Sequence, residues 1–179
     1  MQVLLGNGRQ FRMGGDAQLR LGTSGVELLK GSIIGWIQPG ASPLDPFRIK
    51  TRLATASIQG TTVFIEYTDE HFKVFSWEGT VTVETRSGQR FTLTSGQQLL
   101  LALQGQMAPL SDRLDGLQVG LSALDTVSSR LLIWDPPQSI PVNDAERRLE
   151  TSPLINGFSR PLETLPVIGR ELGLTAPNP

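Results

Sequence analysis

Short runs of alternating apolar and polar residues, separated by glycine-containing turns, fill the first 105 residues and constrain the fold more than any other feature. In residues 61–67, for example, Val63, Ile65 and Tyr67 fall on one side of an extended chain. Strands alternate with a period of two residues, and glycine adopts the backbone angles that tight turns need. The pattern predicts an all-β domain built as a small sandwich, a barrel or a β-solenoid.

The alternation predicts individual strands with turns between them. A loose internal repeat relates residues 28–34 to residues 76–82, and a similar strand follows each copy, which favours stacked β layers. The predicted strands are residues 3–5, 10–13, 17–21, 26–29, 32–37, 47–51, 61–67, 72–77, 80–85 and 91–94.

The pattern changes twice after the β region. Leucines recur at three and four residues between positions 114 and 131, which predicts a helix within residues 106–133. We expect its apolar face to pack against the β domain, with a partner surface as the alternative. Eight of the twelve prolines lie in residues 134–179, which therefore predict a Pro-rich extended tail with at most one helical turn at residues 144–149. The expected organisation is a β domain (1–105), a packed helix (106–133) and a tail (134–179).

The composition argues against several classes of function. The chain has no cysteine, which removes disulfides, thiolate metal sites and a cysteine nucleophile. The net charge is −1 and the arginines are spread along the chain, so the sequence gives no sign of a basic surface for nucleic acid. The longest aliphatic run, residues 99–103, is too short to span a bilayer, and the first residues do not read as a signal peptide. We expect either a cytoplasmic chain or one whose export segment lies outside this sequence.

The candidate catalytic and metal-binding residues are few. His71 is the only histidine, and its acidic neighbours Asp69 and Glu70 lie in a predicted turn, where solvated charges are normal. A Ser-His-Asp triad lacks the Gly-x-Ser-x-Gly elbow. The acids are too numerous for a chance pair to indicate glycoside hydrolysis: Glu66, Asp69, Glu70, Glu78 and Glu84. We expect no catalytic, cofactor-binding or metal site, and a protein that is not an enzyme.

The features most open to a binding role are Trp36, Trp77 and Trp134. Large aromatic residues are enriched at interfaces but are also ordinary core residues, and both interpretations stay open. Trp77 precedes a Glu-Gly turn and is the one we expect to be partly exposed. Exposed strand edges offer a second route to a protein partner.

Several short motifs, in a fixed order, resemble the FecR family. They are Leu19-Arg20-Leu21-Gly22-Thr23-Ser24, Pro46-Phe47-Arg48-Ile49-Lys50-Thr51, Gly60-Thr61-Thr62-Val63-Phe64, Glu78-Gly79-Thr80-Val81-Thr82-Val83 and Leu93-Thr94-Ser95-Gly96-Gln97. The resemblance covers roughly residues 17–103. The physical reading agrees with it, because the motifs place glycines at turns and apolar residues at inward positions.

The resemblance implies a β-rich, solenoid-like domain and a non-catalytic role. FecR proteins regulate sigma factors, and their periplasmic part receives a signal from an outer-membrane transporter. We therefore expect a protein-binding regulatory or sensory module of extracytoplasmic signalling, located in the periplasm or outside the cell. Neither the sigma-binding head nor the membrane span of the family is recognisable here. The alternative is a structural or surface-adhesion domain on the same scaffold.

Overall fold

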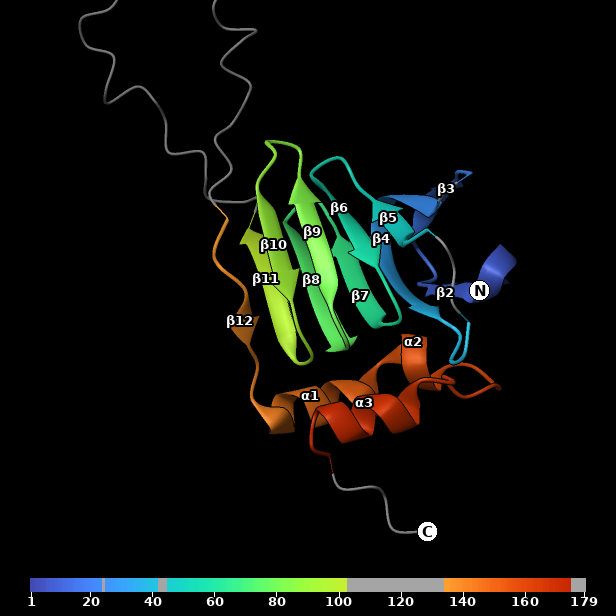
Figure 1. Cartoon of the computed structure of the whole chain (residues 1–179). Helices are drawn as coiled ribbons and strands as arrows, with labels where there is room; N and C mark the ends of the chain where they lie inside the picture. Colours follow the sequence, from blue (N-terminus) through green and yellow to red (C-terminus); the bar gives the residue numbers. More distant parts are fainter. Residues whose placement is uncertain (24, 42–44, 103–133, 175–179) are drawn as a thin grey trace, which may run out of the picture.

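The computed structural model describes residues 1–23, 25–41, 45–102 and 134–174. Within them the chain is mostly β, and three helices gather at one side of the curled sheet (Figure 1). The mainly β class is therefore confirmed. The helix expected within residues 106–133 lies outside the described residues.

The described strands belong to one continuous twelve-stranded sheet. The strands are β1 (Gln2–Leu4), β2 (Arg9–Met13), β3 (Gln18–Leu21), β4 (Gly25–Ile37), β5 (Phe47–Lys50), β6 (Ala54–Ile58), β7 (Thr62–Tyr67), β8 (His71–Glu78), β9 (Val81–Thr85), β10 (Arg90–Leu93), β11 (Gln97–Ala102) and β12 (Gln138–Ser139). The helices are the 3-10 turn η1 (Gly6–Gly8), α1 (Val142–Thr151), α2 (Pro153–Asn156) and α3 (Leu165–Glu171).

The long strand β4 joins two layers. Its first half pairs with β3 and β5, and its second half pairs with β2 and β7. The change of layer falls at Gly31, which has φ +93° and lies so close to the chain at Ala17 that a Cβ would stand 2.6 Å from the Ala17 Cα. Only glycine accepts that angle and that approach.

Each half of β4 therefore organises its own layer. We call the layer of β1, β2, the second half of β4, β7, β8, β11 and β12 the helix-side layer, because the helices pack on it. The layer of β3, the first half of β4, β5, β6, β9 and β10 is called the second layer.

The main core fills the space between the two layers. Gly35 of the helix-side layer leaves room for the second layer, because a Cβ there would lie 2.9 Å from the Ile49 side chain and 3.0 Å from the Phe47 ring. Trp134 closes one end of the core, with its ring 5.5 Å from that of Phe72. Fully buried members from both layers include Phe11, Leu28, Ile33, Phe47, Ile49, Ile58, Val63, Ile65, Val74, Val81, Val83, Leu93 and Leu99.

The expected β-solenoid does not describe this sheet. A solenoid stacks coils with parallel neighbours, whereas every pair of described strands except β4–β5 is antiparallel. The reason lies in the short turns between most consecutive strands, since a short turn can join only antiparallel neighbours.

The C-terminal region also differs from its expected form. Residues 142–171, predicted to be an extended tail, contain α1, α2 and α3. Their apolar residues do lie on the domain, where Leu154, Ile155, Leu162 and Ile168 form a second core with the helix-side layer. Among the described residues, no helix has the length and apolar character needed to cross a bilayer.

The bend at Gly31 generates a stability prediction. Gly31→Ala should lower the free energy of unfolding by about 3 kcal/mol or more, because it adds a steric clash to the unfavourable positive φ. Urea unfolding measures the change.

The matched control is Gly88→Ala. Gly88 has a similar φ of +86°, but no atom lies within 4 Å of the position of its Cβ. It should cost only about 1 kcal/mol, the backbone penalty alone. Equal losses for the two variants would show that the close approach to Ala17 is unimportant.

Candidate functional site

The outer face of the helix-side layer is unusually apolar for a face that points away from the main core. Alternate residues of β4 and β8 place Ile34, Trp36, Phe75 and Trp77 there, all buried. Strands buried on both faces carry apolar residues at consecutive positions, and residues 72–77 are apolar except for Lys73 and Ser76. The helices cover part of this face and leave the rest beside an open groove.

The groove has a volume of about 670 Å³, within the range of ligand-binding pockets. Its sheet side comprises Phe64, Glu66, Lys73, Phe75 and Trp77, from β7 and β8. The opposite side carries Arg148 and Thr151 of α1, Leu154 of α2 and Phe158, and one end is formed by Met1, residues 13–16 and Ser32. The lining of the groove thus combines residues from the N-terminal strands with residues from the C-terminal helices.

Arg12 holds in place the side of the groove formed by α1, α2 and Phe158, which we call the helical wall. Its side chain is fully buried and donates hydrogen bonds to the carbonyls of Leu154 and Ile155, at 3.1 and 3.0 Å, and to that of Arg160. The guanidinium lies over the rings of Trp36 and Phe158, 5.5 and 4.5 Å from their centroids. The carbonyls accept hydrogen bonds from the guanidinium N–H groups, and the aromatic rings stabilise its positive charge.

The environment of Arg12 also affects its titration. Burial lowers the pKa of the Arg12 guanidinium, and the nearby Glu163 carboxylate opposes that effect. Arginine keeps its charge in proteins, so a buried cation remains at the base of the helical wall.

A second polar junction holds α3 at the end of β8. Glu171 accepts a hydrogen bond from the backbone N–H of Gly79 at 2.8 Å and another from the Ser95 hydroxyl, and these bonds lower its pKa. Glu78 lies buried beside it and accepts a bond from the Thr62 hydroxyl at 2.9 Å. Burial raises the pKa of Glu78, the Thr62 bond opposes this, and the charge of Glu171 adds to it.

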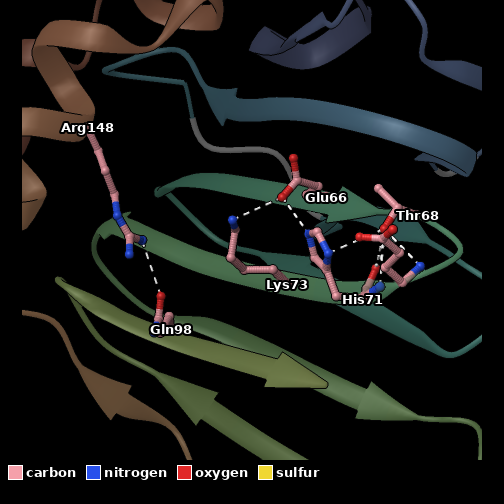
Figure 2. A network of polar contacts seen from close by, with 7 residues as sticks. Glu66, Thr68, His71, Lys73, Gln98 and Arg148 are labelled. Carbon is pink, nitrogen blue, oxygen red and sulfur yellow. Dashed lines mark hydrogen bonds and ion pairs between the residues drawn. The ribbon is translucent and has the colours of Figure 1, made fainter. Parts of the chain in front are cut away.

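Charged side chains line the groove on the sheet side. Glu66 of β7 receives contacts from His71 Nε2 at 2.7 Å and Lys73 Nζ at 2.9 Å, both on β8 (Figure 2). Burial pushes the pKa of Glu66 up, but the bonds from His71 and Lys73 outweigh it and hold the pKa below its ordinary value. The Lys73 ammonium also lies 5.5 Å from the centre of the Phe64 ring.

Arg148 crosses from α1 to the sheet. Its guanidinium donates to Gln98 Oε1 at 3.2 Å (Figure 2). It also lies 5.3 Å from the centre of the Phe75 ring. Lys73 and Arg148 are thus held above two neighbouring aromatic rings. This arrangement combines aromatic surface with fixed charges of both signs, which suits recognition of an amphipathic segment.

The candidate residues His71, Asp69 and Glu84 lie in ordinary polar contacts. His71 does not stay in a solvated turn: it begins β8, half-buried, and contacts Glu66. The Thr68 hydroxyl beside it accepts from the backbone N–H groups of Glu70 and His71, so it shapes the turn. No group of three or more potential metal ligands occurs among the described residues. Asp69 pairs instead with Lys30, and Glu84 with Arg90.

The three tryptophans are buried. Trp36 and Trp77 belong to the second core and Trp134 to the main core, with 1, 3 and 8% of their surface exposed. The expected partial exposure of Trp77 is therefore wrong, although Trp77 does border the groove. Sequence reasoning missed Arg12, Lys73 and Arg148, the cations of this region. For Lys73 the signal is a single charge within the otherwise apolar residues 72–75, whereas the segments around Arg12 and Arg148 contain other polar residues and give no such signal.

Comparison with known proteins agrees with the fold. Residues 1–82 match the model of the family described as FecR protein, which confirms the resemblance expected from the motifs. No curated protein matches the chain. Two crystal structures of a candidate anti-sigma factor from Parabacteroides distasonis ATCC 8503 are similar, each at 16% identity. The TM-scores are 0.50 and 0.51, the matches cover 84 and 88% of this chain, and each covers 87% of the other chain.

The Arg12 contacts generate a prediction for the helical wall. Arg12→Met should lower the free energy of unfolding by about 3 kcal/mol or more, because three carbonyls lose their charged donor. Hydrogen exchange should rise first in residues 142–171, before the sheet. Arg20→Met, at an exposed pair with Glu27, should stay within about 0.5 kcal/mol of the parent. Uniform acceleration of exchange over the whole chain would contradict a local clamp.

The Glu66 contacts generate a pH prediction. A carboxylate whose folded pKa is lowered stabilises the protein above its unfolded pKa, and that contribution disappears as the pH falls through the folded pKa. Glu66→Gln should therefore be about 1–2 kcal/mol less stable than the parent at pH 7, and the gap should close between about pH 5 and pH 3. Chemical unfolding at each pH measures the gap.

Glu84→Gln is the control, since the Glu84–Arg90 pair is exposed and should contribute less than about 1 kcal/mol. A gap for Glu66→Gln that stays constant down to pH 3 would mean that the His71 and Lys73 contacts do not favour the charged carboxylate.

Proposed function

We propose that this chain, a FecR-family protein over residues 1–82, is a non-catalytic regulatory module of sigma-factor signalling that binds a protein partner in the groove. The observation that carries the proposal is the groove itself, in which Lys73 and Arg148 lie over the rings of Phe64 and Phe75. The similar structures of a candidate anti-sigma factor share the fold.

The groove suits a protein segment for two physical reasons. Aromatic residues and arginine are enriched where interfaces derive most of their affinity, and Phe64, Phe158 and Arg148 are half-buried there. The side chains are also held in place before any partner arrives, by Glu66 on Lys73 and by Gln98 on Arg148. Such preorganisation reduces the entropy lost on binding.

The charges in the groove lining indicate which charges the partner's segment should carry. Lys73 is already paired with Glu66, so Arg148 is the cation that favours an acidic residue on the partner, while Asp16 and Glu66 in the lining disfavour a second one. An amphipathic segment with apolar residues flanking a single carboxylate meets these requirements. The family resemblance of residues 1–82 favours an extracytoplasmic location, in the periplasm or outside the cell.

Complementation in the source bacterium tests the proposal. Deleting the gene should change the transcription of genes controlled by an alternative sigma factor, and the parent chain should restore it. Phe64→Ala/Arg148→Ala should fail to restore it. Each truncation at an interface centre costs about 2 kcal/mol, or roughly 30-fold in affinity. Transcript sequencing and an immunoblot for the chain provide the readouts.

Arg147→Ala is the matched control, because Arg147 neighbours Arg148 on α1 but is 70% exposed and pairs only with Asp144 among the described residues. It should complement like the parent. Full complementation by the groove variant, at the same protein level, would overturn the role of the groove.

A further inference from the structure

The outer face of the second layer carries a separate hollow. Its volume is about 780 Å³, and it lies over β5, β6 and β9 with the turns at their ends. It shares no lining residue with the groove, because the main core separates the two layers. The two surfaces are therefore independent of each other.

The fold gathers cations here that are scattered along the sequence. Five line the hollow, against two carboxylates: Arg48, Lys50, Arg52, Arg86 and Arg90 against Glu27 and Glu84. We call these five cations the arginine face. The whole chain has a net charge of −1, so the local excess of positive charge is balanced by negative charge on the rest of the chain.

The two carboxylates do not neutralise the arginine face. Glu84 pairs with Arg90 at 3.1 Å, and Glu27 pairs with Arg20, outside the lining, at 2.9 Å. Arg48, Lys50, Arg52 and Arg86 form no ion pair within the described part of the chain. Four cations of this face are therefore available to an anionic partner.

Hydroxyl groups accompany the cations in register across the strands. Arg48 stands opposite Ser57, which stands opposite Thr82. Lys50 stands opposite Thr55. These positions alternate with the core residues Phe47, Ile49, Ala56 and Val83, so they project outward.

The rim that carries two of the arginines is firmly held. The Arg86 N–H donates to the Leu53 carbonyl at 2.9 Å and so ties the turn after β9 to the turn after β5. The Thr51 hydroxyl accepts from the N–H groups of Leu53 and Ala54, each at 3.2 Å. Arg52 and Arg86 are thus presented from neighbouring turns with a defined separation.

We propose that the arginine face binds an acidic peptide segment of a second protein. Guanidinium groups match carboxylates with paired hydrogen bonds, and the neighbouring hydroxyls can donate to backbone carbonyls. The lining has no aromatic residue, so it lacks the stacking platform that single-stranded nucleic acids use. Six extended residues reach about 20 Å, enough to cross the four strands β5, β6, β9 and β10 at about 4.8 Å spacing.

Fluorescence anisotropy with labelled hexaglutamate tests the proposal on the full chain. Hexaglutamate should bind and uncharged hexaglutamine should not, and raising the salt concentration should weaken binding. Arg48→Gln/Arg86→Gln should weaken binding roughly tenfold, since each exposed charge contributes a few-fold. Arg147→Gln/Arg170→Gln removes as many charges from α1 and α3 and should bind like the parent.

Three results would overturn the proposal: no hexaglutamate binding at low salt, equal weakening by the two double variants, or tighter binding of duplex DNA or heparin than of hexaglutamate. The second would indicate an effect of total charge, and the third a different class of polyanion. Thermal unfolding of both double variants, expected within a few degrees of the parent, separates lost binding from lost structure.

Discussion

The buried guanidinium of Arg12 is the interaction on which the arrangement of the two ends of the chain depends. It comes from β2, near the N-terminus, and besides Gln2 its hydrogen-bond acceptors are carbonyls of α2 and of Arg160, more than 140 residues later. A buried cation without partners is far more costly than one fully bonded, so the helices cannot move away without a large penalty. Their position covers Trp36 and Phe75 and supplies the second wall of the groove. One side chain thus links the folding of the C-terminal region to the formation of a binding surface.

The two layers differ because their outer faces have different neighbours. In β5 the core residues Phe47 and Ile49 alternate with Arg48 and Lys50, as expected of a strand with one face in solvent. In β8 both sets of alternate residues contribute core side chains, since Phe72 and Val74 enter the main core while Phe75 and Trp77 enter the second. The outward residues of a strand therefore indicate whether the helices cover its layer: they are charged in β5 and include aromatic residues in β8.

Much of the β architecture could be predicted from the alternation alone, and the failures have physical causes. β6 was missed because its inward residues Ala54 and Ala56 are small and give a weak apolar signal. β4 was divided in two at Gly31, where the strand in fact continues through a bend. The helices are not predicted because the density of prolines in this region favours an extended chain. Pro141, Pro153 and Pro166 instead stand at or near helix starts, where a missing N–H costs nothing. The groove was beyond sequence reasoning, since its lining combines Lys73 with Arg148, which are 75 residues apart in the sequence.

Net charge was the least informative quantity for this chain, and the sheet register explains why. Arg48, Arg86 and Arg90 are far apart in sequence, but β5 pairs with β6, β6 with β9 and β9 with β10, so outward residues of all four strands share one face. Several acidic side chains lie elsewhere and form their own contacts, such as the ion pair of Glu66 with Lys73 and the hydrogen bond of Glu171 with Gly79. A nearly neutral protein can therefore present a cationic surface and an amphipathic groove on opposite layers. Because the main core separates these surfaces, a segment bound at one does not obstruct the other, and the same small domain has room for two contacts at once.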